Sequence, residues 1–223
     1  MGTEFLMPQN NLATGRANAR KPHTGRQDLI AAALKLLGPH RSVSTLSLRE
    51  VARAAGIAPN SFYRHFRDVD ELAIALIDEA GASLRKIIRE ARLRISSGEG
   101  GVIRPSVEAF MDQLEADKKL LHILMREGTV GSDAFKQAVE HELRHFEEEL
   151  RVDLIRLSAA NGDPIYRPEL VARAITRLAF AIGGGAMDLP AEQRALIKED
   201  LVEMVTMIMA GTQTLKRAED ARS

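Results

Sequence analysis

Apolar residues recur at helical spacing along almost the whole chain, and we find no segment with the alternating pattern of a half-buried strand. The first amphipathic segment has its apolar stripe at Ile30, Ala33, Leu34 and Leu37. Gly38-Pro39 ends it. Thr24 and Gln27 have the spacing of a capping box, so this helix is expected to begin at Thr24. The pattern predicts an all-α fold.

A long helix is expected after residue 67. Asp68 and Glu71 have the spacing of a capping box, and the apolar stripe continues to about Ile95. At 1.5 Å per residue, its ~28 residues would span roughly 42 Å, which is long enough to join two modules. The segment SSGEGG (96–101) is typical of a linker. Beyond it, the periodicity predicts helices near 103–116, 118–127, 132–159, 168–186 and 190–216.

Between these parts, the segment SLREVARAAGIAPNSFYRHF (47–66) has the layout of a helix-turn-helix. Ser47 and Glu50 can cap a short helix, Gly56 can adopt the positive φ of a tight turn, and Pro59 can open a third helix over 60–66. Buried contacts that fix the interhelical angle are expected from Val51, Ala52, Ala55, Ile57 and Phe62. An ordinary corner between two helices is the alternative.

If the third helix enters a DNA major groove, its first exposed positions face base edges. These positions include Asn60 and Ser61. Tyr63 and His65 follow them and are suited to phosphate oxygens. Charge agrees with this hypothesis. Residues 1–67 carry ten Lys or Arg against three acidic residues, a charge of +7, whereas the whole chain has a formal net charge of zero.

The last helix has an apolar face that is wider than a single-sided surface helix needs. Part of that face is expected either to be buried in its own domain or to meet a second subunit. The glycines 183–185 in the preceding helix would allow a close approach, so we expect a homodimer.

The chain has no cysteine, which excludes disulfides and thiolate metal sites. No apolar run approaches the roughly 20 residues of a membrane span, and the N-terminal segment lacks a secretory h-region. A cytoplasmic protein with no membrane partner is expected. We expect a flexible basic arm over 1–23, whose residues 1–6 resemble a cloning remnant, then a helix-turn-helix DNA-binding domain over 24–67. A ligand-binding and dimerisation domain is expected over 68–223.

The stretch LREVARAAGIAPNSFYRHFRDVDEL (48–72) resembles the TetR family of bacterial repressors. Within that family, SFYRHFRDVDEL is most similar to the FabR and DesT group, which regulates unsaturated fatty-acid synthesis. The resemblance implies a homodimer that binds a palindromic double-stranded DNA operator. It also implies a body that binds a small apolar effector, here a fatty acyl-CoA or acyl-carrier thioester. No enzymatic activity and no cofactor are implied.

The resemblance also assigns DNA contacts. Base contacts are implied for Arg49, Asn60 and Ser61. Phosphate contacts are implied for Ser47, Tyr63 and His65.

The effector site is expected among large apolar residues that a helix bundle cannot all pack tightly. The predicted ligand-binding residues are Phe110, Leu114, Phe146, Phe180 and Met187, with Met111 and Leu124 as further candidates. Simple core packing is the alternative for each of them. The phosphates of an acyl thioester would be met by one of Arg89, Arg92, Arg126 and Arg144. A body that responds to a protein partner or to a different apolar ligand remains an alternative function.

The stretch HELRH (141–145) matches the His-Glu-x-x-His pattern of zinc hydrolases. On the expected helix, His141 lies roughly 170° and His145 roughly 130° from the centre of the apolar stripe. Both imidazoles are thus expected on the polar side, whereas a zinc hydrolase holds them in a cleft with a third ligand. We predict no metal site and no catalytic residue here, and a solvated face that includes Glu142 and 147–149. A zinc metallohydrolase is kept only as a remote alternative.

Overall fold

The computed structural model describes residues 25–37, 41–95, 101–116, 132–162 and 164–222. Within these ranges every regular element is a helix, which confirms the predicted all-α class. The elements are α1 (Arg26–Leu36), a short 3-10 helix η1 (Val43–Thr45), α2 (Leu48–Ala54), α3 (Pro59–Phe62), α4 (Val69–Ile95), α5 (Ile103–Ala116), α7 (Asp133–Asn161), α8 (Pro168–Ala186) and α9 (Ala191–Asp220). The helix predicted over 118–127 lies outside the described residues.

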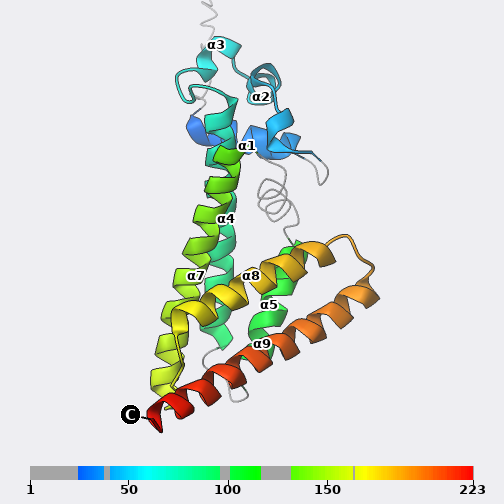
Figure 1. The fold of residues 1–223 in the computed structure, drawn as a ribbon. Coiled ribbons are helices and arrows are strands. Elements are labelled where there is room, and N and C mark those ends of the chain that lie inside the picture. The colour runs from blue at the N-terminus through cyan, green and yellow to red at the C-terminus, as the bar shows by residue number, and fades with distance from the viewer. Residues whose placement is uncertain (1–24, 38–40, 96–100, 117–131, 163, 223) are drawn as a thin grey trace, which may run out of the picture.

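The molecule is elongated, with the short helices at one end (Figure 1). Helices α1, α2 and α3 form this end, which we call the head. Helices α4 and α7 lie side by side along the long axis and run in the same direction away from the head. Helices α5, α8 and α9 gather around their far ends, and we call this part the body. Helix α4 therefore belongs to both parts.

The helix starts are set by local side-chain caps. The Ser47 hydroxyl accepts a hydrogen bond from the Glu50 backbone N–H at 3.3 Å, and Asp68 accepts one from Glu71 at 2.8 Å, as predicted. The start of α1 differs from the prediction. Its N-cap is Gly25, whose N–H donates to the Asp28 carboxylate at 2.8 Å, and Thr24 lies outside the described residues. Asp28 reaches this N–H because it occupies the third position of the helix.

Helix α3 is shorter than the predicted 60–66, because it ends at Phe62. The chain then tightens into turns between residues three apart. The Arg64 N–H donates to the Ser61 carbonyl at 3.3 Å, and the His65 N–H donates to the Phe62 carbonyl at 2.9 Å. Such bonds close the end of a helix whose last carbonyls have no partner further along.

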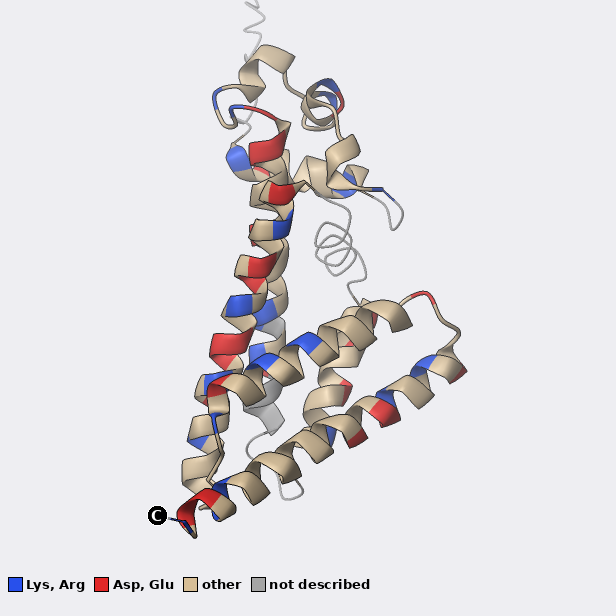
Figure 2. Cartoon of the chain, viewed as in Figure 1, with Lys and Arg blue, Asp and Glu red and all other residues tan. Residues whose placement is uncertain are grey.

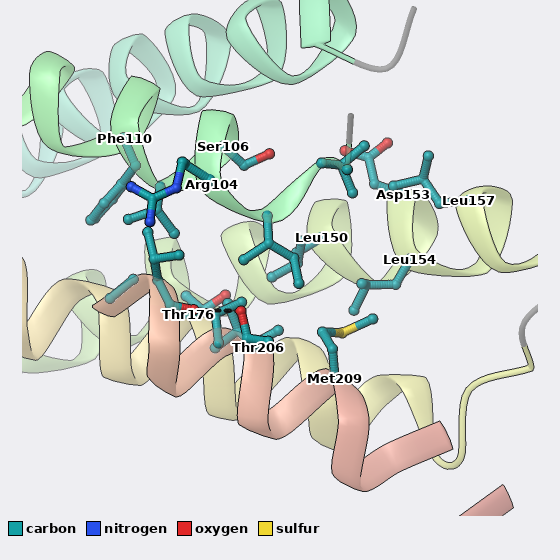
Figure 3. Close-up of a pocket in the computed structure, with 18 of the residues that line it drawn as sticks. Arg104, Ser106, Phe110, Leu150, Asp153, Leu154, Leu157, Thr176, Thr206 and Met209 are labelled. Carbon is teal, nitrogen blue, oxygen red and sulfur yellow. Dashed lines mark hydrogen bonds between the residues drawn. The ribbon is translucent and has the colours of Figure 1, made fainter. Parts of the chain in front are cut away.

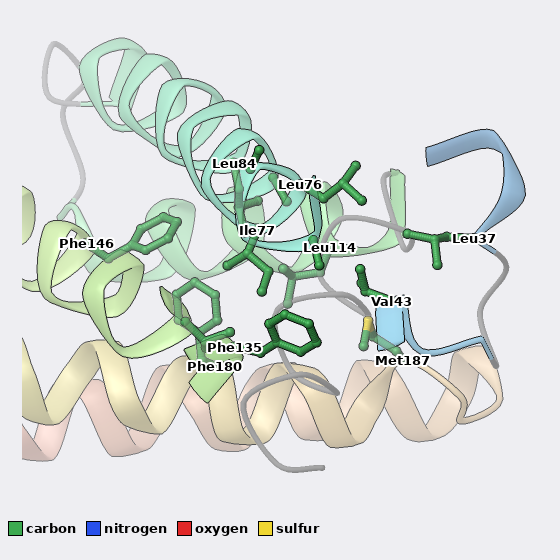
Figure 4. Close-up of a cluster of buried hydrophobic side chains, with 14 of the residues drawn as sticks. Leu37, Val43, Leu76, Ile77, Leu84, Leu114, Phe135, Phe146, Phe180 and Met187 are labelled. Carbon is green, nitrogen blue, oxygen red and sulfur yellow. The ribbon is translucent and has the colours of Figure 1, made fainter. Parts of the chain in front are cut away.

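One apolar core runs from the head into the body (Figure 4). In the head, the side chains of Phe62 and Phe66 are fully buried. Leu76 and Leu84 of α4 extend this core towards the body, where it reaches Phe146 and Phe180. Since close-packed interiors transmit displacement, the head and the body are mechanically joined through α4.

The polar side of α7 is less exposed than predicted. Glu142 and Glu147 are buried, so the expected solvated face is wrong at these two positions. Arg85 of α4 donates a hydrogen bond to Glu142, and Arg177 of α8 donates one to Glu147 at 2.7 Å. Basic and acidic residues alternate along α7 (Figure 2). The carboxylates are buried because two neighbouring helices bring arginines to them, as burial of charge requires.

Candidate DNA-binding surface and effector cavity

Helices α2 and α3 meet at a tight turn. Gly56 has a φ of +70°, the positive value that the sequence predicted for it. The Ile57 N–H donates to the Ala52 carbonyl at 2.9 Å and so ties the turn to α2. Val51, Ala52 and Phe62 have no exposed surface, which fixes the angle between the two helices.

The six residues predicted to contact DNA all lie on α2, α3 and their ends. Arg49, Asn60 and Tyr63 are exposed, and Tyr63 has 60% of its surface accessible, an unusual exposure for an aromatic side chain. Ser61 and His65 are half-buried beside them. Ser47 is exposed as well, and its hydroxyl can still donate while it accepts the capping hydrogen bond.

A bidentate ion pair braces the start of α2. Arg41 donates to both oxygens of Glu50 at 2.7 Å and also to the Thr45 carbonyl at 3.1 Å. The guanidinium holds the pKa of the Glu50 carboxyl below its usual range. The pair neutralises the acid on the helix that carries Arg49, so the exposed surface stays basic. Sequence reasoning missed this pair, because nine residues separate its partners and no helical spacing relates them.

A cavity of about 680 Å³ lies in the body, among α4, α5, α7, α8 and α9 (Figure 3). Its wall is mostly apolar, with Ile88, Phe110, Phe146, Phe180, Leu201 and Met209. The Phe180 ring packs against the rings of Phe110 and Phe146. Ring centroids are 5.5 Å apart for Phe110 and Phe180, and 4.8 Å apart for Phe146 and Phe180. A volume of this size is within the range of ~300–1,000 Å³ that small-molecule sites occupy.

Polar side chains are fewer and come from four helices, α5, α7, α8 and α9, with Thr176 as the contribution of α8. Arg104 and Ser106 come from α5, Asp153 and Arg156 from α7, and Thr206 from α9. The arginines are not free in this structure. Arg104 donates to both oxygens of Glu199 at 2.7 Å, and Arg156 donates to Asp153 at 3.1 Å. A bound polar group would have to share or replace these partners.

The predicted effector residues are only partly brought together. Phe110, Phe146 and Phe180 line the cavity as expected. Leu114 and Met187 do not, because they pack where α5 crosses α8 at Gly183. A Cβ atom at Gly183 would lie 3.2 Å from the Phe110 ring, so the glycine permits this close crossing. Met111 packs in the same region, and Leu124 lies outside the described residues.

Two of the four arginines proposed for a phosphate have described side chains, Arg89 and Arg144, and neither lines the cavity. Arg89 and Arg144 are exposed elsewhere, the side chain of Arg92 is not described, and Arg126 lies outside the described residues. Arg104 and Arg156 line the cavity instead and were missed. The sequence signal that could have identified Arg104 is its position at the start of the helix that follows the linker 96–101.

His141 and His145 are exposed, as their positions on the helix predicted. Their Nε2 atoms are 3.0 Å apart. Burial and the nearby Arg85 lower the pKa of His145. In the part of the chain that the structure describes, no group of three or more His, Cys, Asp or Glu side chains is placed to hold a metal ion.

The described helices include none that is both long and apolar enough to cross a membrane.

Residues 29–76 match the model of the family described as "Bacterial regulatory proteins, tetR family". This range contains the helix-turn-helix and the first part of α4.

Several solved structures share the fold over nearly their whole length. A transcriptional regulator from Rhodococcus sp. Rha1 is 21% identical with a TM-score of 0.64, over 85% of this chain and 98% of that one. A tetR-family regulator from Streptomyces coelicolor is 25% identical with a TM-score of 0.62, over 88% and 85%. The fatty acid degradation regulator FadR from Bacillus halodurans is 17% identical with a TM-score of 0.61, over 80% and 96%. All three are described as regulators. The comparisons do not favour the alternative that this chain is a zinc hydrolase.

Proposed function

We propose that this chain is a DNA-binding transcriptional regulator of the TetR type and not an enzyme, and that it acts as a homodimeric cytoplasmic repressor controlled by a small apolar effector. Residues 24–67 would form the DNA-binding domain and 68–223 the ligand-binding and dimerisation domain. The observation that carries the proposal is the apolar cavity of about 680 Å³, which is bordered by the same helix α4 that begins at the head.

In the DNA complex, α3 would lie in the major groove, which has room for one helix. Asn60 and Ser61 at the start of α3 would contact base edges together with Arg49 of α2. Tyr63, His65 and Ser47 would bind phosphates on either side. The exposure of Ser47, Arg49, Asn60 and Tyr63 at α2 and α3 supports this assignment.

Two exposed stripes on neighbouring helices support a dimer. The stripe on α8 consists of Leu170, Ala174, Ala181 and Gly185, with the half-buried Leu178 between them. The stripe on α9 consists of Leu196, Met204, Met207, Gly211 and Leu215. Apolar and small residues at spacings of three and four are what packed helices need at an interface. We therefore place the twofold contact on these two helices, which would form a four-helix interface with their copies.

For the effector we favour a fatty acyl thioester, as the resemblance to the FabR and DesT group implies. The cavity offers an apolar wall for an acyl chain, and Arg104 and Arg156 offer donors for a polar head group. A structural relative, FadR from Bacillus halodurans, is described as a regulator of fatty acid degradation.

The effector can act only if it binds the DNA-competent and DNA-incompetent shapes with different affinity. Helix α4 is the proposed lever, because its residue Ile88 borders the cavity and its first turn packs in the head. A palindromic operator has half-sites about one DNA turn apart, roughly 34–36 Å. A shift of α4 would change how well the two heads match that spacing.

The test begins with an operator selected from a random library of DNA duplexes. Its affinity is measured at fixed salt, with and without palmitoyl-CoA and oleoyl-CoA. We expect one or both thioesters to change the affinity by about 5–150-fold, the usual range of allosteric coupling. A protein that selects a palindrome but ignores both thioesters would keep the repressor assignment and lose the acyl effector. A protein partner or another apolar ligand would then be the function to pursue.

Two substitutions in the head should separate base reading from phosphate binding. Asn60→Ala is expected to weaken operator binding by about 1–3 kcal/mol and to relax the sequence preference. Tyr63→Phe removes only a hydroxyl that would donate to phosphate, so it should weaken operator and random DNA alike. Fluorescence anisotropy titrations on both duplexes measure these losses. Equal losses of both variants on both duplexes would contradict the assignment.

A further inference from the structure

A buried ion pair joins α4 to α7 on the side of the cavity that faces the head. Arg85 of α4 donates a hydrogen bond to the Glu142 carboxylate of α7, and its Nε lies 3.8 Å from an oxygen of Glu149. Glu142 has only 4% of its surface exposed, and the Arg85 side chain has 17%. This burial lowers the pKa of Arg85.

Gly81 makes room for this pair, one turn before Arg85. A Cβ atom at Gly81 would lie 2.7 Å from Cγ of Glu142 and would overlap its carboxylate. Real Cβ atoms do not approach other atoms so closely, so the side chain of Glu142 occupies the space that any other residue at 81 would fill. The position of the carboxylate therefore depends on the backbone of α4 as well as on Arg85.

The pair also touches the wall of the cavity. The Arg85 guanidinium lies 5.7 Å from the centroid of the Phe146 ring, and Phe146 lines the cavity from α7. Ile88, less than one turn after Arg85, lines the cavity from α4. A molecule that fills the cavity therefore meets side chains on both helices that the ion pair joins.

A buried ion pair resists gradual displacement. Separating its charges leaves each one desolvated and without a partner, which is costly, so two discrete arrangements are favoured over a continuous slide. Such a two-state contact is what allosteric coupling between distant sites requires.

We propose that the Arg85–Glu142 pair, seated at Gly81, is the contact through which occupancy of the cavity sets the position of α4 and hence of the head. This inference rests on the proposed effector function, because it assigns the regulation of that same cavity. Filling the cavity moves Phe146 and Ile88, the pair re-forms in a second arrangement, and α4 shifts along α7. Arg85 and Glu142 act here as positioning residues and touch no ligand.

The experiment compares the full-length wild type with Glu142→Gln and Gly81→Ala. The first variant removes the charge of the carboxylate, and the second displaces the carboxylate without changing any charge. Glu148→Gln is the matched control on the same helix, because its carboxylate is exposed and pairs with Arg151 of α7 itself. For each protein we would measure the affinity for oleoyl-CoA, and the operator affinity with and without saturating oleoyl-CoA.

We expect the affinity for oleoyl-CoA to stay within about twofold in all four proteins. Oleoyl-CoA should change the operator affinity less in Glu142→Gln and Gly81→Ala than in the wild type. The effect should be about 2–30-fold smaller, which is the usual effect of mutations on coupling. It should stay at the wild-type value in Glu148→Gln. A wild-type effect in both test variants would overturn the proposal.

A second measurement needs no effector. Since the chain has no cysteine, Ala31→Cys in α1 gives a single spin-label position in the head of each subunit. The distance between the two labels is expected to differ between the Glu142→Gln protein and the wild type without any ligand. If oleoyl-CoA leaves wild-type DNA binding unchanged, the effector proposal fails. The distance between the two labels then tests by itself whether the ion pair sets the position of the head. Unchanged distances in Glu142→Gln and Gly81→Ala would then refute it.

Discussion

Replacing Phe62 with alanine is expected to lower the free energy of unfolding by about 3–5 kcal/mol, the usual cost of truncating a buried phenylalanine. The Phe62 side chain has no exposed surface, and its ring packs against Phe66 at a centroid distance of 5.7 Å. It is also the residue on α3 that anchors this one-turn helix to the core. The variant should therefore lose operator binding as well, because α3 is no longer held at its angle to α2.

Thermal unfolding and operator binding measure the two losses together. Phe62→Leu is the matched control, since it retains most of the apolar volume and should keep most of the stability. A Phe62→Ala protein with the wild-type melting temperature would show that α3 is held by something other than this ring.

The second large effect is expected at the proposed dimer contact. Met207 has 65% of its surface exposed in the single chain and lies in the α9 stripe. In Met207→Glu, a twofold contact would bury two unpaired carboxylates, which is strongly unfavourable. The dimer should dissociate. Operator affinity should then fall by about 10²–10⁴-fold, because each monomer binds its half-site independently.

Sedimentation equilibrium gives the oligomeric state, and titration on a full operator and on a single half-site gives the affinities. The half-site affinity should be unchanged in Met207→Glu. Ala195→Glu introduces the same charge at an exposed position of α9 outside the stripe, so it should remain dimeric. A Met207→Glu protein that stays dimeric would place the contact elsewhere.

The head was predictable because its determinants are local. The caps at Ser47 and Asp68 depend on a partner three residues away, and the positive φ of Gly56 depends on its own backbone. The start of α1 is also local, because Asp28 accepts a hydrogen bond from Gly25 three residues before it, but this pair was not the one that the sequence predicted.

The cavity was predictable only in part. Periodicity identified Phe110, Phe146 and Phe180 as large apolar residues of the body, but it could not separate them from Leu114 and Met187. All five are inward-facing, and which of them border empty space depends on how α5, α8 and α9 cross. That crossing is set by close approach at Gly183, a contact between helices far apart in the sequence.

The sequence by itself determined the described long helices and the helix-turn-helix, apart from the end of α3, because each follows from spacings of three or four residues along one helix. Only the tertiary structure decided the burial of Glu142 and Glu147 and the presence of Arg104 and Arg156 at the cavity. One helix shows in its periodicity where its own apolar face lies. It does not show which other helices cover its remaining faces, nor which charges they bring to them.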